Sequence, residues 1–185
     1  MKNTATLLVL LILAVIKVTA SDSTIWLDKN IALTPLTEKA WLIQTSYSCN
    51  GNLDCNHLLV IDSLDVVLVN TPATDSMTAV LLQCIEKKFY RKVTKVMVSH
   101  FHDDSAGGLT ETNKRGIKSY GFDKTNELLK PDNTPIDVLF HDSIAIQLQT
   151  LELKLFYFGA GHSVDNMVTW YPGEKILFGG CLLKS

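Results

Sequence analysis

The sequence predicts one layered α/β domain, because short β-rich runs alternate with stretches of helical periodicity along most of the chain. The chain has 185 residues, of which 46% are hydrophobic, enough for a single domain with a substantial core. Ten glycines, five prolines and 19% charged residues exclude a collagen-like chain and a highly charged disordered one. A formal net charge of −2, without a Lys/Arg cluster, gives no indication of a nucleic-acid partner.

The predicted strands are short apolar runs bounded by turn residues. Residues 41–45, 57–61 and 66–69 come first, with Asn50-Gly51-Asn52 and Asp62-Ser63 between them, which predicts an antiparallel meander. Further strands are predicted at residues 94–98, 143–148, 151–158, 167–171 and 175–178.

Two helices are predicted between these strands. After Asn70-Thr71-Pro72, apolar residues recur at i, i+3, i+4, i+7 and i+8, which predicts one buried stripe. They are Met77, Val80, Leu81, Cys84 and Ile85. A second helix is predicted at residues 123–129, closed by Pro131. Helices of this kind are expected to cover sheet faces.

The first 20 residues have the pattern of a signal peptide. A short basic start precedes an apolar run at residues 5–16, and Val18-Thr19-Ala20 offers small residues for cleavage. The run is shorter than the roughly 20 residues that span a membrane, so cleavage is favoured over the alternative of an uncleaved anchor. We expect residues 21–185 to form one exported domain, periplasmic or secreted.

The segment after residues 94–98 carries the clearest chemical pattern. In extended backbone, residues two apart point the same way, so His100, His102 and Asp104 are expected to project from one face. Two imidazoles and a carboxylate suit a divalent transition metal. Gly107-Gly108 is expected to let the backbone turn away sharply. The alternative is a polar loop with two solvated histidines.

Two later predicted strands end in the same way. Gly159-Ala160-Gly161-His162 follows one and Gly179-Gly180-Cys181 the other, so each brings a good zinc ligand just beyond a strand. If the strands run in register, five potential ligands gather at one rim. Dispersed mixed ligands favour a catalytic zinc site over a structural one.

These three motifs together resemble those of the zinc metallo-β-lactamases. They are His100-x-His102-x-Asp104 with Gly107-Gly108, Gly161-His162-Ser163-x-Asp165-Asn166, and Gly179-Gly180-Cys181-Leu182-Leu183-Lys184. The resemblance covers roughly residues 25–185 and is closest to the subclass with three His at one zinc and Asp, Cys and His at the other. It implies an αββα sandwich that hydrolyses the β-lactam amide of penicillins, cephalosporins and carbapenems, conferring antibiotic resistance.

The resemblance also implies roles for individual residues and two zinc ions. The implied ligands of the first zinc are His100, His102 and His162. Asp104 and Cys181 are implied to hold the second zinc, which stabilises the leaving nitrogen, so Asp104 is also catalytic. Lys184 is implied to bind the carboxylate of the substrate and to be catalytic with it. The implied partner is a small β-lactam molecule, and we expect a monomer.

The sequence departs from the family in two places. The family supplies a third ligand to the second zinc, a His in a later segment that also contributes the last strand and helix, whereas this sequence stops at Ser185. We therefore expect a sandwich without that strand and helix, from a partial gene product. His57 and His141 are predicted to be ordinary surface or hydrogen-bonded histidines. Asn70 stands where relatives commonly have Asp, which is expected to alter a hydrogen bond rather than a ligand.

Some alternatives stay open. Thioesterases and lactonases of the same superfamily usually carry a His after the motif's Asp and a later bridging Asp, where this chain has Ser105 and Cys181. An inactive zinc-binding fragment is the other alternative. Cys84 is expected to be a small core residue. Cys49 and Cys55 flank a turn where relatives have a mobile hairpin over the active site, and their spacing allows a disulfide without requiring it.

Overall fold

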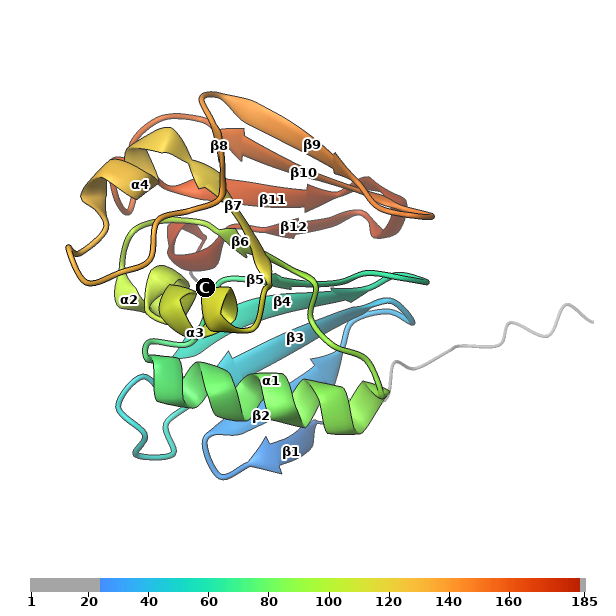
Figure 1. The fold of residues 1–185 in the computed structure, drawn as a ribbon. Helices are drawn as coiled ribbons and strands as arrows, with labels where there is room; N and C mark the ends of the chain where they lie inside the picture. Colours follow the sequence, from blue (N-terminus) through green and yellow to red (C-terminus); the bar gives the residue numbers. More distant parts are fainter. Residues whose placement is uncertain (1–23, 184–185) are drawn as a thin grey trace, which may run out of the picture.

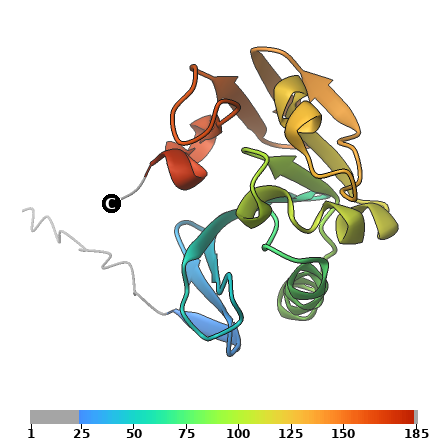
Figure 2. The ribbon, with the colours of Figure 1, turned by 90° about the vertical axis from the view of Figure 1, so that its left-hand side faces the viewer.

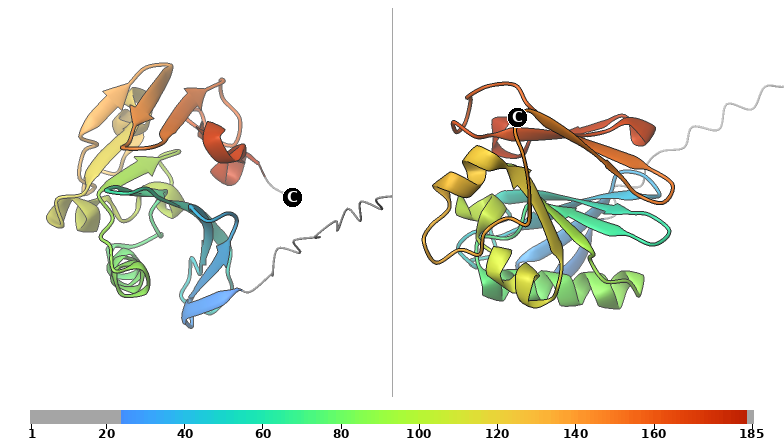
Figure 3. Two further views of the ribbon diagram at one scale, coloured as in Figure 1. Left: turned by 90° about the vertical axis from the view of Figure 1, so that its right-hand side faces the viewer. Right: turned by 45° about the horizontal axis from the view of Figure 1, so that its top comes forward.

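The computed structural model describes residues 24–183, which form two β-sheets packed face to face (Figure 1). The first sheet has eight strands in the order β1-β2-β3-β4-β5-β6-β7-β8, and the second has four in the order β12-β11-β10-β9. Seen along the strands, the sheets form separate layers and α1 appears end-on (Figure 2; Figure 3, left). The predicted layered α/β architecture is confirmed. The predicted signal peptide and Lys184 lie outside the described residues.

The first sheet changes from antiparallel to parallel pairing at β5. Its strands are β1 (Ile25–Asp28), β2 (Ile31–Pro35), β3 (Ala40–Thr45), β4 (Cys55–Ile61), β5 (Val66–Val69), β6 (Lys95–Val98), β7 (Lys118–Phe122) and β8 (Val138–Phe140). β1 to β5 pair in an antiparallel manner, which confirms the predicted meander as β3, β4 and β5. β5 to β8 pair in parallel, so β5 and β6 end at the same edge.

The helix α1 (Asp75–Phe89) covers the face of the first sheet that points away from the second. It begins after Thr74, whose hydroxyl accepts a hydrogen bond from the Met77 N–H, and it ends at Tyr90 in left-handed backbone. Its buried residues are Met77, Thr78, Leu81, Leu82 and Ile85. The expectation that Val80 belongs to this stripe is wrong, because its side chain is 38% exposed and turned toward solvent.

The second sheet closes a separate core against the other face of the first sheet. Its strands are β9 (Ser143–Gln147), β10 (Glu152–Tyr157), β11 (Met167–Tyr171) and β12 (Ile176–Phe178). Leu153 and Leu155 of β10 pack in one cluster with Leu58 and Val60 of β4. This inter-sheet core sets the distance between the loops that follow the two sheets. Among residues 24–183, no helix is long and apolar enough to cross a membrane.

Candidate metal centre

The candidate ligands lie in segments that follow β6 of the first sheet and β10 and β12 of the second. β10 and β12 are both antiparallel to β11, so they run in the same direction and end at the same edge. The loop after β10 carries His162, and the short 3-10 helix η2 (Gly180–Leu182) after β12 carries Cys181. This shared direction explains why the ends of β10 and β12 bring His162 and Cys181 to the same edge, as the sequence predicted.

The backbone after β6 is not extended in the way that the sequence suggested. His102 precedes the short helix α2 (Asp103–Ala106), and Asp104 lies in its first turn. The prediction that His100, His102 and Asp104 alternate along extended backbone is therefore wrong, because Asp104 is helical. A helix of four residues is too short to be recognised from a periodic sequence pattern. From this helix the side chain of Asp104 approaches the bend that carries His100, and its Oδ1 lies 3.4 Å from Nε2 of His100.

Gly107 and Gly108 are needed for close packing rather than for a special turn. The chain does turn at these two residues, between α2 and the residues that follow, but their φ angles of −65° and −106° are ones that any residue adopts, so the turn itself does not require glycine. A Cβ on Gly107 would lie 2.3 Å from the carbonyl oxygen of Ala73, and one on Gly108 would lie 2.0 Å from Oγ1 of Thr78. The two glycines let α2 approach the start of α1, and this contact places Asp104.

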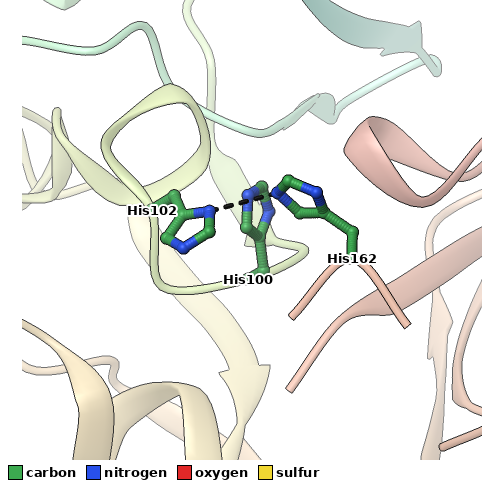
Figure 4. A group of neighbouring side chains, drawn as sticks. All are labelled: His100, His102 and His162. Atoms are coloured by element: carbon green, nitrogen blue, oxygen red, sulfur yellow. Dashed lines mark hydrogen bonds between the residues drawn. The ribbon is translucent and has the colours of Figure 1, made fainter. Parts of the chain in front are cut away.

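Three imidazoles converge at the edge of the two sheets. One ring nitrogen from each of His100, His102 and His162 lies within 4.8 Å of the other two. Nδ1 of His102 and Nε2 of His162 are 3.1 Å apart (Figure 4). Two nitrogens that bind one tetrahedral zinc at about 2.0–2.1 Å are themselves about 3.3 Å apart. The distance between His102 and His162 therefore matches two ligands of one zinc ion, and His100 lies beside them as the third potential ligand.

The orientation of His100 supports the same fit. Its ring is 1% exposed, and Nδ1 lies 3.1 Å from Oγ of Ser99. Nε2 faces the other ligands and is buried without a hydrogen bond of acceptable geometry among the described residues. Oδ1 of Asp104 is a polar neighbour at 3.4 Å, and a metal ion at this position would satisfy the buried nitrogen.

A second group of potential ligands adjoins the first and shares His100 with it. It consists of His100, Asp104 and Cys181. The Cys181 thiol donates to Oδ2 of Asp104 across 2.8 Å. Burial on its own raises the pKa of Asp104, but the adjacent His100 imidazole and Cys181 thiol outweigh it and hold the pKa below its usual range. Carboxylate and thiolate ligands suit zinc, so this group also fits the metal.

Asn70 supports the segment that carries His100. Its backbone is left-handed, with φ of 67°, at the end of β5. Its Oδ1 accepts hydrogen bonds from the backbone N–H of Ser99, at 3.0 Å, and from Oγ of Ser105, at 2.7 Å. Asn70 belongs to neither ligand group, in line with its predicted role in hydrogen bonding.

The two remaining histidines lie where ordinary structural roles explain them. His57 is fully buried in β4, and its Nε2 lies 2.8 Å from Oγ1 of Thr45. His141 is exposed, and its Nδ1 lies 2.8 Å from a carboxylate oxygen of Asp123. Neither belongs to a ligand group among the described residues, as predicted.

Several residues of the pocket had no local sequence pattern that could identify them. Tyr47, Asp54 and Cys55, from the loop between β3 and β4 and the start of β4, line one pocket with His102, Asp104, His162 and Cys181. Cys49 and Cys55 are both free thiols, the first exposed and the second buried, so the disulfide that the sequence left open is absent. Cys84 is half-buried in α1, with its thiol 3.8 Å from the carbonyl oxygen of Leu27.

Together, the two-sheet sandwich and its adjoining three-His and His-Asp-Cys groups define a metal-binding α/β protein. No family model matches the chain. The chain is 32% identical over 167 residues to the metallo-β-lactamase type 2 of Bacteroides fragilis, covering 89% of this chain and 67% of the relative. It is 33% identical over 157 residues to that of Bacillus cereus, covering 84% of this chain and 61% of the relative.

Solved structures give the same result. A metallo-β-lactamase from Pontibacter korlensis superposes with a TM-score of 0.78 at 27% identity, covering 84% of this chain and 73% of that one. The metallo-β-lactamase IND-7 superposes with a TM-score of 0.78 at 30% identity, covering 85% and 74%. The chain belongs to the metallo-β-lactamase family. It spans about two thirds or less of the length of these two curated relatives.

Proposed function

We propose that the protein hydrolyses the amide bond of β-lactams with zinc as its cofactor. The observation that carries this proposal is the convergence of three imidazoles from two different sheets at one edge, next to a carboxylate and a thiol. Family membership supports the same activity. Penicillins, cephalosporins and carbapenems are the proposed substrates, and two zinc ions are the proposed complement, one held by His100, His102 and His162 and the other by Asp104 and Cys181.

The residues have distinct proposed roles. Zinc at the three-His group would supply a Lewis acid and a water of lowered pKa. Ser99 orients the ring of His100 so that Nε2 faces the metal position. Asp104, whose pKa is held below its usual range, is ionised at neutral pH and can serve as an anionic ligand beside Cys181. Lys184 is proposed to bind the carboxylate of the substrate.

The test is hydrolysis of nitrocefin by the purified protein in excess zinc, with and without a chelator. We expect zinc-dependent turnover that His162→Ala abolishes. His141→Ala is the matched control, because His141 is exposed and lies outside both ligand groups among the described residues. Turnover of thioesters or lactones without turnover of β-lactams would instead assign the protein to another activity of the superfamily.

We also propose that the protein acts in the periplasm or outside the cell, where it would confer resistance. The support is the signal-peptide pattern of residues 1–20. N-terminal sequencing of the exported protein is expected to begin at Ser21, and a cytoplasmic chain that keeps Met1 would contradict this.

A further inference from the structure

The loop between β3 and β4 is joined to α2 by a polar cluster beside the candidate metal centre. The Tyr47 hydroxyl donates a hydrogen bond to Oδ2 of Asp103 across 3.2 Å. Nζ of Lys130 lies 2.7 Å from Oδ1 and 2.8 Å from Oδ2 of the same carboxylate. Three segments that are distant in sequence therefore meet at the side chain of Asp103.

This cluster adjoins the pocket without being part of either ligand group. Asp103 lies between His102 and Asp104 in the sequence, yet among the described residues it belongs to neither group. Its carboxylate instead binds Tyr47 and Lys130, and Tyr47 lines the pocket together with both of these potential ligands. Asp103 therefore faces the loop between β3 and β4, which forms one wall of the pocket.

The loop between β3 and β4 is braced internally and at its tip, and Tyr47 joins it to α2. The backbone N–H of Tyr47 donates to Oδ1 of Asp54 across 2.6 Å, which joins the two ends of the loop. The N–H of Gly51 donates to Oδ1 of Asn30 across 3.0 Å, which joins its tip to the turn between β1 and β2. On the side of α2, the contact from Tyr47 to Asp103 links this braced loop to the metal-binding segment.

The charges in the cluster suit a persistent contact at neutral pH. Burial and the adjacent Asp103 carboxylate raise the pKa of Tyr47, so its hydroxyl remains a donor. The hydrogen bond to Asp103 raises the pKa of Lys130, which remains a cation. Lys130 therefore compensates the negative charge of Asp103 beside the pocket and restrains the carboxylate that accepts the hydrogen bond from Tyr47.

We propose that Asp103 is a positioning residue that latches the β3–β4 loop against the pocket through Tyr47, with Lys130 holding its carboxylate in place. The consequence for substrates rests on the proposed hydrolase function: the latched loop forms part of the substrate wall, so its release raises KM without changing kcat. One net hydrogen bond corresponds to about a 3- to 10-fold change in KM. Because Lys130 is a partly exposed ion-pair partner, its removal has a smaller effect.

The first experiment does not depend on activity. Hydrogen exchange of residues 46–54 is measured in the full zinc-loaded chain for wild type, Tyr47→Phe, Asp103→Ala and Tyr90→Phe. Tyr90 is 92% exposed at the end of α1, so its variant removes a hydroxyl away from the cluster. Faster exchange is expected in the first two variants and wild-type exchange in the control. Equal exchange in Tyr47→Phe and wild type overturns the latch.

Steady-state kinetics with nitrocefin provide the second measurement. We expect raised KM and unchanged kcat in Tyr47→Phe and Asp103→Ala, and partial recovery of both KM and loop exchange in Asp103→Asn, which keeps an acceptor oxygen for Tyr47. A wild-type KM in Tyr47→Phe overturns the positioning role. If the wild-type chain hydrolyses no β-lactam while loop exchange follows the expected order, the proposed function fails and the latch stands.

Discussion

His57 is a fully buried histidine in β4, which lies two strands away from β6, the strand that leads to the metal-binding segment. Burial lowers its pKa to about 4, so the ring is neutral at physiological pH, and its Nε2 lies against the Thr45 hydroxyl. In the unfolded chain the same group has a pKa of about 6.5. Between these two values the unfolded state binds more protons, so the free energy of unfolding falls as pH falls from about 6.5 to about 4.

Between pH 6.5 and pH 4, protonation linked to His57 is expected to lower the free energy of unfolding by an amount on the order of 3 kcal/mol. Urea denaturation of the metal-free protein at several pH values between 4 and 7 measures it. His57→Gln is expected to flatten the acid side of the profile, even if its stability at pH 7 is lower. His141→Gln is the control: its hydrogen bond to Asp123 raises the pKa of His141, so the stability it contributes is present at low pH and lost as pH rises. Parallel profiles for wild type and His57→Gln would contradict the prediction.

Cys181 offers a second prediction at the same scale, because a thiol bound to a metal loses its proton and gives a characteristic absorption with cobalt. In the cobalt-substituted protein we expect a thiolate-to-metal charge-transfer band that Cys181→Ser removes. Cys84→Ser, in α1 on the far face of the first sheet, is expected to retain it. Persistence of the band in Cys181→Ser would remove this residue from the proposed ligands.

At the scale of elements, the tight contact between α2 and the start of α1 yields the next prediction. In Gly107→Ala, the new methyl group would collide with the backbone of Ala73, so α2 must shift. Overpacking of this kind costs roughly 1–3 kcal/mol in the free energy of unfolding. Because Asp104 belongs to α2, zinc affinity is expected to fall as well. Gly173→Ala is the control, because a Cβ added at Gly173 would meet no atom closer than the Tyr171 ring, at 3.2 Å.

Urea denaturation and zinc titration of both variants test this prediction. Unchanged stability and zinc affinity in Gly107→Ala would show that α2 can move at no cost.

The elements also show what the sequence could and could not predict. The meander β3–β5 and the helix α1 were predicted, because apolar runs between turn residues mark the strands and apolar residues at helical spacing mark the helix. β7 and β8 were missed, since β7 contains Gly121, whose missing side chain makes room for Ile136, and β8 has only three residues. β1, β2, α2 and α3 (Leu109–Lys114) were likewise not predicted. Short elements take their conformation from neighbouring strands and helices, which are not local in sequence.

The same limit holds for the candidate site. Spacing and glycine context identified His100, His102, Asp104, His162 and Cys181, because each residue directly follows a recognisable strand or its loop. Tyr47 and Lys130 carry no motif, and only the folded chain brings them to Asp103.

At the scale of the whole molecule, the ligand groups join the two sheets. His100 follows β6 of the first sheet, whereas His162 follows β10 of the second, so one ion at this position would cross-link both halves of the sandwich. Zinc is then expected to stabilise the folded state by mass action, by about 4 kcal/mol at a free concentration of about 1,000 times Kd.

Thermal denaturation in zinc and in chelator measures this linkage. We expect a higher Tm with zinc for wild type and His141→Ala, and a much smaller shift for His162→Ala. A full zinc shift in His162→Ala would mean that the stabilising ion binds elsewhere.

Asn70 occupies a position where asparagine can be exchanged for aspartate without a change in the surrounding backbone. Aspartate tolerates the same left-handed backbone as asparagine and offers an acceptor oxygen in the same place for Ser99 and Ser105. Asn70 also lines a pocket with Asp104 and Cys181, so the exchange of its amide for a carboxylate adds one negative charge beside them. A single substitution can therefore strengthen the attraction of this pocket for cations while the architecture around it stays constant.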